Sequence, residues 1–379
     1  MIYHVLTELE PFSAVRGGAL SHTVANLMRL DPARTVVCPD ADSTWGYGAG
    51  RALVVPELRW YARMRARRFY PQWLMKPVFR LVFRGLLRRL KEGDIVWFHS
   101  QPTFCAALGP EIRRKGAKTI YHCHDAITKK AAISAMRRCR PDAWIFLSNA
   151  QRAEWLPLLP AAINTYVVPN GADETLFFPC ADKRRDPTPV ILYVGRLHPE
   201  KGIQVLMEAM RVLGSRGVRA HCRVVGSSFS GGSRVTPFAR SVVRSGPPGV
   251  RFAGHRSARE VADEFRAADV LCCPSVCQEP FGKVNVEAMA CGLPVVASAV
   301  GGIPEIAAGG GILLVKPGDP VELADKLQLL VEDPSLRKRI GAEGLESFRR
   351  SFTWGMVLKR YREIAAGTDA ISSRKEGEV

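Results

Sequence analysis

The chain has 379 residues, of which 47% are hydrophobic and 24% are charged, and a formal net charge of +18. This length exceeds what one hydrophobic core usually fills and, at roughly 150 residues per domain, predicts two domains of similar size. The composition is typical of a globular protein, and no run of about 18 apolar residues indicates a membrane-spanning helix.

The start of the chain, "MIYHVLTELEPF", lacks the basic start and apolar block of a signal peptide. The ten cysteines are scattered through apolar segments and do not show the short regular spacings of a secreted disulfide scaffold. We therefore interpret all ten as buried reduced thiols and expect a cytoplasmic protein.

Short apolar segments alternate with amphipathic helical stretches, the pattern of parallel sheets covered by helices. The strands expected in the first half are residues 4–6, 35–39, 95–99, 119–124 and 143–148. Those expected in the second half are residues 190–194, 222–226, 250–254, 270–274, 294–297 and 312–315. The sequence thus predicts an α/β protein with two Rossmann-like, doubly wound domains that face a cleft, because ligands of open α/β sheets bind at the carboxyl ends of strands.

The expected domains are residues 1–180 and 181–350, with a hinge in the proline-containing segment "FPCADKRRDPTP" at 178–189. A helix at 351–366 is expected to pack back on the first domain. Residues 367–379 are expected to form a disordered tail.

The segment from Arg59 to Lys91 contains eleven Lys or Arg residues, no acid and several aromatic residues. This combination favours an anionic membrane surface, where basic side chains meet head groups and aromatic rings lie at the interface. Nucleic acid is a competing partner, because phosphate would attract the same side chains. A solvated basic face over ordinary core helices is the third interpretation. We favour the membrane and expect no nucleic-acid partner.

Two loops that follow strands have the composition of anion sites. Gly17 and Gly18 in "VRGGAL" precede a helix whose first amides suit a phosphate, although such a pair is often only a turn. In "YVGRLHPEKG", Arg196 and Lys201 lie five residues apart at the end of a strand. Two cations there are able to hold a diphosphate, whereas an exposed loop with two basic residues is the alternative.

The segment "EPFGKVNVEAMACGLP" has one carboxylate before and one after a turn that contains glycine. Gly282, after Phe281, lets a ligand approach the amides at the start of a helix closely. Glu279 and Glu287 are acceptors for sugar and ribose hydroxyls. The alternatives are an ordinary loop acid and a glutamate near a helix start.

The segment "EPFGKVNVEAMACGLPVVASAVGGIPEI", together with "GRLHPEKG", "VPNGAD" and "RGGAL" in matching order, closely resembles the E-x7-E signature of retaining nucleotide-sugar glycosyltransferases of GT-B fold. The resemblance implies that Glu279 lies beside the donor sugar, that Arg196 and Lys201 bind the diphosphate, and that Glu287 meets the ribose. It assigns the first domain to the acceptor and the second to the donor. The donor-binding residues it implies are Gly17, Gly18, Arg196, Lys201, Glu279, Phe281, Gly282, Lys283, Val284 and Glu287.

The resemblance also implies a histidine near the anomeric centre, at the end of a strand of the first domain. "TIYHCHDAITKK" contains His122 and His124, which point the same way in a strand, so periodicity does not choose between them. Alignment with the family's His-Asp strand end favours His124 as the catalytic histidine, beside Glu279, Arg196 and Lys201. The expected acceptor-side residues are His99, Asp125 and Asn170, and the other histidines are expected to be structural or exposed.

We expect neither a metal nor a cofactor, because the only D-x-D sequence, Asp40 to Asp42, reads as a loop. The expected function is retaining transfer of a sugar from a nucleotide diphosphate, most simply a UDP-sugar, to a hydroxyl of a glycan or lipid-linked glycan. Lipopolysaccharide core at the inner face of the cytoplasmic membrane is the favoured acceptor. The alternatives are a non-catalytic glycan- or nucleotide-binding protein and a nicotinamide oxidoreductase, which the missing G-x-G-x-x-G disfavours.

Overall fold

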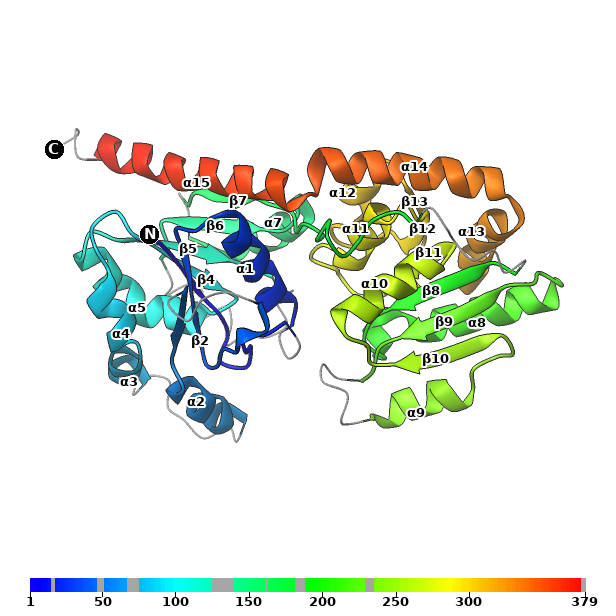
Figure 1. Ribbon diagram of the computed structural model, residues 1–379, viewed down its shortest axis with the longest axis horizontal. Helices are drawn as coiled ribbons and strands as arrows, with labels where there is room; N and C mark the ends of the chain where they lie inside the picture. The colour runs from blue at the N-terminus through cyan, green and yellow to red at the C-terminus, as the bar shows by residue number, and fades with distance from the viewer. Residues whose placement is uncertain are drawn as a thin grey trace. The chain divides into compact units, whose positions relative to one another are not determined.

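The computed structural model describes residues 1–375 except for 15–17, 46–50, 67–74, 125–139, 161–162, 181–187 and 229–234; side chains are also not described at 65–66, 75–76 and 368–375. The chain forms two compact units (Figure 1). Unit 1 comprises Met1–Pro169 and Leu358–Val379, and unit 2 comprises Asn170–Val357. The boundary at residues 169 and 170 precedes the segment in which the sequence placed a hinge.

Unit 1 contains a parallel sheet of seven strands in the order β3-β2-β1-β4-β5-β6-β7. The strands are β1 (Ile2–Val5), β2 (Arg34–Cys38), β3 (Ala52–Val54), β4 (Ile95–His99), β5 (Lys118–His122), β6 (Ala143–Phe146) and β7 (Thr165–Val167). Its helices before the final one are α1 (Ala19–Leu30), α2 (Glu57–Ala66), α3 (Met75–Val82), α4 (Arg84–Arg89), α5 (Pro102–Arg114) and α7 (Asn149–Trp155). Every residue of β2, β4 and β6 is buried, as expected for strands covered on both faces.

Unit 2 contains a parallel sheet of six strands in the order β10-β9-β8-β11-β12-β13. The strands are β8 (Val190–Val194), β9 (His221–Val225), β10 (Val250–Gly254), β11 (Val270–Cys273), β12 (Val295–Ser298) and β13 (Ile312–Val315). Its helices are α8 (Ile203–Ser215), α9 (Pro237–Arg244), α10 (Ala258–Ala267), α11 (Lys283–Ala290), α12 (Ile303–Ala307), α13 (Pro320–Glu332) and α14 (Pro334–Ser351). The strand order reverses between β8 and β11, which is where ligands bind in doubly wound sheets. The two Rossmann-like units expected from the sequence are confirmed.

The last helix, α15 (Trp354–Lys375), begins in unit 2 and belongs to unit 1 from Leu358 onward. In unit 1 its Tyr361 is fully buried, with its ring 5.0 Å from that of Trp97 in an edge-to-face contact. The helix extends through residues 367–375, most of the segment expected to be a disordered tail.

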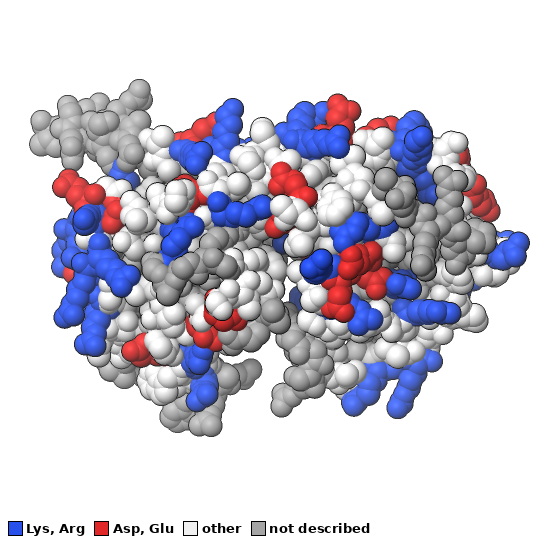
Figure 2. Space-filling view, viewed as in Figure 1, with Lys and Arg blue, Asp and Glu red and all other residues white. Residues whose placement is uncertain are grey.

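The basic segment from Arg59 to Lys91 has an ordinary amphipathic fold where the structure describes it. Tyr61, Phe79 and Phe83 lie in the core of unit 1 around Phe104, so these three rings are unavailable to a membrane interface. Trp60 is exposed, and the outward residues of α4 are basic. Figure 2 shows Lys and Arg side chains gathered on the side of unit 1 where α4 and α5 lie. Among the described residues, no helix has the length and apolar character needed to cross a membrane.

The cysteines differ in part from the expectation. Six are buried free thiols, namely Cys38, Cys123, Cys222, Cys272, Cys273 and Cys291. Cys180 and Cys277 are free but only half-buried, and Cys105 is disulfide-bonded, so its interpretation as a reduced thiol is wrong. Cys139 lies outside the described residues.

Candidate functional site

The candidate donor site of unit 2 lies where the strand order reverses. Lys201 follows β8, and Glu279 follows the neighbouring strand β11. Their side chains form an ion pair between Lys201 Nζ and Glu279 Oε1. The hydroxyl of Ser275 donates to the same Oε1 at 2.9 Å. Glu279 Oε2 has no hydrogen-bond partner within the described ranges, so one carboxylate oxygen is left to accept from a ligand hydroxyl.

Three loops meet around Glu279 because glycine allows them to approach closely. The backbone N–H of Val276 donates to the carbonyl of Glu200 at 2.9 Å, and that of Gly302 donates to the carbonyl of Glu279 at 2.8 Å. At Gly202 (φ 68°) a Cβ would lie 1.7 Å from the carbonyl oxygen of Pro274. The ion pair is thus held by backbone contacts between the loops after β8, β11 and β12.

We expect Gly202→Ala to lower the free energy of unfolding of unit 2 by roughly 3 kcal/mol or more, because it adds a backbone clash to an unfavourable φ. The matched control is Gly217→Ala, since Gly217 has a similar φ of 75° and no atom within 4 Å of its Cβ position. The control should cost about 1 kcal/mol. Urea unfolding of both variants measures the difference, and equal losses would show that the Pro274 contact is unimportant.

Arg196 is exposed in the loop after β8, and its side chain has no ion-pair or hydrogen-bond partner in the described part of the chain. Its carbonyl accepts from the buried hydroxyl of Tyr193 at 2.9 Å, which fixes the backbone beneath the guanidinium. Burial raises the pKa of Tyr193 well above its usual range, so this hydroxyl stays protonated. The backbone of Arg196 is therefore fixed, and its guanidinium has no partner among the residues that the structure describes.

The start of α11 presents backbone amides beside Glu279. Gly282 caps the helix at φ 92°, and a Cβ there would lie 2.7 Å from the side-chain nitrogen of Asn285. Phe281 is buried against Phe352, whereas Lys283 and Val284 are half-buried. Asn285 is fully buried, and neither its Nδ2 nor its Oδ1 has a partner among the described residues. The sequence did not indicate Asn285, because a polar residue in the first turn of a helix usually points to solvent.

Glu287 lies on α11 with its carboxylate 3.4 Å from Lys283 Nζ, one helical turn earlier. Burial raises the pKa of Glu287, and the Lys283 ammonium lowers it in part. A buried carboxylate with one cation beside it retains acceptor capacity for the hydroxyls of a ligand.

The loop before α1 differs from the phosphate site that the sequence suggested. The N–H of Ser21 in the first turn donates to Glu10 Oε1 at 3.0 Å. A Cβ on Gly18 would lie 2.9 Å from both Glu10 carboxylate oxygens. A carboxylate of the chain itself thus occupies the position where a phosphate was expected. Gly17 lies outside the described residues.

A cluster of four histidines lies at the centre of the unit 1 sheet. His4 in β1, His99 in β4 and His122 in β5 are fully buried, and His124, just after β5, is half-buried. The rings of His122 and His124 are 3.8 Å apart, so the two residues lie on one face of the strand as expected. His99 does not line an open surface, since both of its nitrogens bond to other histidines, and Asp125 lies outside the described residues.

One nitrogen of each of His99, His122 and His124 lies within 4.8 Å of the others. Three imidazoles are a donor set that zinc uses. Both ring nitrogens of His99 are already hydrogen-bonded, so a metal ion would have to displace one of these bonds.

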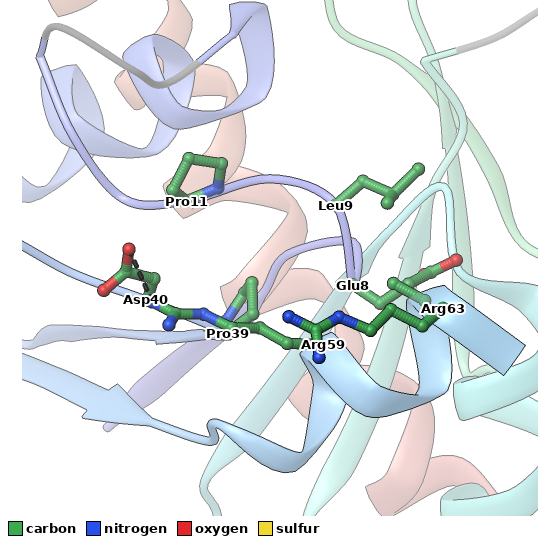
Figure 3. A pocket seen from close by; sticks show the side chains of 8 residues that line it. Glu8, Leu9, Pro11, Pro39, Asp40, Arg59 and Arg63 are labelled. Carbon is green, nitrogen blue, oxygen red and sulfur yellow. Dashed lines mark ion pairs between the residues drawn. The ribbon is translucent and has the colours of Figure 1, made fainter. Parts of the chain in front are cut away.

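A cavity of about 360 Å³ lies at the carboxyl edge of the unit 1 sheet (Figure 3). It is lined from the loop after β1, the end of β2 and helix α2. Arg59 forms an ion pair with Asp40 at 2.6 Å, whereas Arg63 is exposed and has no ion-pair partner in the described ranges. Asn170, expected on the acceptor side, instead belongs to unit 2 and is buried with an unpartnered Oδ1 among the described atoms.

Residues 181–347 match the family model "Glycosyl transferases group 1", and residues 20–176 match the model "Glycosyltransferase Family 4". Most of unit 2 thus matches the group 1 glycosyltransferases, and most of unit 1 matches glycosyltransferase family 4. The family expected from the E-x7-E segment is therefore confirmed at this level, and its signature residues Glu279 and Glu287 lie in the matched range.

Two relatives of known name are similar to this chain over somewhat more than half of its length. It is 37% identical over 212 residues to a D-inositol 3-phosphate glycosyltransferase of Corynebacterium efficiens, a match to 52% of this chain and 50% of that one. It is 30% identical over 249 residues to an alpha-maltose-1-phosphate synthase of Mycolicibacterium smegmatis, a match to 59% of this chain and 64% of that one. The chain thus spans about half the length of the first relative and less than two thirds of the second.

Solved structures share the fold of this chain over nearly all of its length. A sucrose-phosphate synthase of Thermosynechococcus elongatus superimposes with a TM-score of 0.77 at 22% identity, covering 98% of this chain and 99% of that one. Anabaena HepE in complex with UDP and glucose gives 0.75 at 19% identity, covering 97% and 99%. At this identity the likeness shows the fold alone.

Proposed function

We propose that the protein is a retaining glycosyltransferase that moves a sugar from a nucleotide diphosphate donor to a hydroxyl acceptor. The single observation that carries the proposal is the Lys201–Glu279 pair, which lies where the strand order of unit 2 reverses. Arg196 lies in the same loop as Lys201, and its side chain has no partner among the described residues. Cations there stabilise the diphosphate as it leaves the sugar, and Glu279 accepts from sugar hydroxyls.

The roles of the individual residues follow from this placement. Arg196 and Lys201 bind the diphosphate together with the amides at Gly282 and the start of α11. Glu287 accepts from the ribose. His124 of unit 1 contacts the sugar. We expect no metal, since the two cations take over its part in charge stabilisation. HepE binds UDP and glucose in its crystal structure, which supports a UDP-sugar as the first donor to test.

The proposal is tested by incubating the purified protein with a panel of nucleotide sugars and measuring slow donor hydrolysis by release of the nucleoside diphosphate. One donor should be hydrolysed faster than the others, and an acceptor should accelerate its turnover. Binding of UDP-sugars without any turnover or transfer would favour the non-catalytic binding protein instead.

Two acceptor classes have support. The basic surface of α4 favours a glycan or lipid-linked glycan of the cell envelope, such as lipopolysaccharide core, on an anionic membrane face. A phosphorylated polyol or sugar is the second class, since the relatives are named for D-inositol 3-phosphate and maltose 1-phosphate. Arg63 at the unit 1 cavity, which has no ion-pair partner within the described ranges, is a cation for such a phosphate. A panel of both acceptor types, with the donor held constant, decides between them.

If the envelope acceptor is correct, the protein should bind vesicles that contain anionic lipid. Neutralising Arg63, Arg65, Arg67 and Arg68 to Gln should then reduce binding about 100-fold or more, at roughly 1 kcal/mol for each cation near the surface. The matched control neutralises four exposed arginines of unit 2, namely Arg240, Arg244, Arg251 and Arg259. Vesicle sedimentation measures both, and equal losses would indicate net charge alone instead of a membrane-binding segment.

A further inference from the structure

A continuous chain of hydrogen bonds runs through the core of unit 1 and ends at His124. Arg34 Nη1 lies 2.9 Å from His4 Nε2, and His4 Nδ1 lies 2.9 Å from His99 Nε2. His99 Nδ1 lies 2.9 Å from His124 Nε2. The side chains of Arg34, His4 and His99 are fully buried, and only His124 at the end of the chain is partly accessible.

The chemistry of Arg34 gives this chain a direction. A guanidinium has N–H donors and no acceptor, so His4 Nε2 has to accept. A neutral imidazole carries one N–H, and His4 therefore holds its proton on Nδ1 and donates to His99 Nε2. By the same step His99 donates from Nδ1 to His124 Nε2. Burial lowers the pKa of all three histidines, for His124 to about 3, so each is neutral at physiological pH.

We propose that Arg34, His4 and His99 are positioning residues that hold His124 in the tautomer with its proton on Nδ1. If His124 carried a proton on Nε2, that N–H would point at the N–H of His99 Nδ1, and two donors would oppose each other. With a proton on His124 Nε2, the two preceding bonds would have to reverse, and His4 would then direct an N–H at the guanidinium. The Arg34 guanidinium, at one end of this series of hydrogen bonds, thus selects the tautomer of His124 at the other end.

The backbone around His124 is held separately. Ser100 is the only non-glycine residue with positive φ in the described ranges, at 51°. In this conformation its hydroxyl accepts from the N–H of His124 at 3.0 Å, and its own N–H donates to the carbonyl of His122 at 2.9 Å. Ser100 thus orients the His124 backbone, while the hydrogen-bond chain orients the ring.

The consequence concerns what His124 offers to a ligand. Nε2 is occupied by His99, so Nδ1 is the ring nitrogen left for a ligand, and it is an N–H donor with no lone pair available to accept a proton. His124 then binds an acceptor oxygen, such as a sugar hydroxyl or ether oxygen, and does not act as a base through Nδ1. The identity of this ligand rests on the proposed function, whereas the tautomer does not.

The test is the ring-nitrogen NMR spectrum of protein labelled with ¹⁵N-histidine, recorded at pH 7 through two-bond proton–nitrogen correlations. His4, His99 and His124 should each show a protonated Nδ1 and an unprotonated Nε2. In Arg34→Gln the amide is able to donate or accept, so the His124 signals should move toward the other tautomer. Arg34→Lys retains a terminus that only donates and should preserve the wild-type tautomer.

His4→Phe provides a second way to break the chain if Arg34→Gln does not fold. The rings of His4 and Trp97 are 5.6 Å apart. A phenyl ring at position 4 retains this packing but removes the N–H that donates to His99. The His124 tautomer should again be released. With an active donor, kcat should fall roughly 3- to 10-fold, the effect of one weakened hydrogen bond, while KM for the nucleotide sugar should change little.

Three results would overturn the proposal. The first is a protonated Nε2 on wild-type His124, and the second is a His124 tautomer unchanged in both Arg34→Gln and His4→Phe. The third is stoichiometric binding of added Zn²⁺ that shifts His99, His122 and His124 together, which would make the cluster a metal site. Because the NMR measurement needs no turnover, failure to find a donor would count against the proposed function and leave this test intact.

Discussion

Lowering the pH from 7 to 5 should destabilise unit 1 steeply. His4, His99 and His122 are fully buried, and burial lowers the pKa of each imidazole well below 6.5. In the unfolded chain these groups take up protons near pH 6.5, so below that pH the unfolded state binds more protons. Stability is therefore complete above about pH 6.5 and is lost as the pH falls toward the folded-state pKa values. His124, whose pKa burial lowers to about 3, is a fourth such group. Four groups give a slope of roughly 5 kcal/mol per pH unit, which is large against a total of about 5–15 kcal/mol.

Urea unfolding followed by tryptophan fluorescence at several pH values measures this slope, because every tryptophan except Trp354 belongs to unit 1. His4→Phe removes one buried imidazole and should flatten the slope by roughly 1.4 kcal/mol per pH unit. His255→Gln removes an exposed imidazole of unit 2 and serves as the control. A free energy of unfolding that stays constant between pH 7 and 5 would show that the folded and unfolded states take up equal numbers of protons, so that burial does not lower these pKa values.

Most strands of both units could be predicted from the sequence because each is a short apolar run between helical stretches. The strands expected at 95–99, 190–194, 250–254 and 312–315 coincide with the structure. Two edge strands, β3 (Ala52–Val54) and β7 (Thr165–Val167), were missed. None of their residues is fully buried, and three residues are too few to show a period. Short length matters here more than edge position, because the longer edge strands β10 and β13 of unit 2 were predicted.

The unit 2 site was largely accessible from sequence because its residues lie in one contiguous segment and one strand-end loop. Lys201 and Glu279 were named separately, and the structure joins them. Ser275 was missed, although it lies only four residues before the carboxylate to which it donates. The position of a hydroxyl in a loop depends on backbone angles that sequence spacing does not determine.

The unit 1 site was harder to predict because its residues come from four strands. Sequence offered His99, His122 and His124 as separate candidates and placed His4 among structural or exposed histidines. The parallel register aligns His4 with Trp97 and His99 with His122, which brings the imidazoles together. Arg34 at the start of β2 is a charged residue in an apolar strand, and its burial against His4 has no local signal. Only the sheet order reveals the cluster.

Glu279→Gln should lower kcat/KM for the nucleotide-sugar donor by roughly 100- to 1,000-fold, which corresponds to about 3–4 kcal/mol of lost transition-state stabilisation. The amide retains the shape of the carboxylate but removes the charge that holds Lys201 Nζ, and it replaces an acceptor by a donor toward the sugar. Lys201 is then no longer fixed beside the leaving diphosphate. Because the interaction with the leaving group grows in the transition state, kcat should fall more than KM rises.

The matched control for Glu279→Gln is Glu264→Gln on α10. Both glutamate side chains are 11% exposed and both form an ion pair with a basic residue, Glu264 with Arg223 at 2.8 Å. The two variants should lose similar stability in thermal unfolding, but only Glu279→Gln should lose activity. Steady-state kinetics and isothermal titration with the nucleoside diphosphate measure both effects. The proposed role would be contradicted if Glu279→Gln retained more than a third of the wild-type kcat/KM and Glu264→Gln gave the same kcat/KM. The Lys201–Glu279 pair would then be structural, and the reacting sugar would have to bind elsewhere.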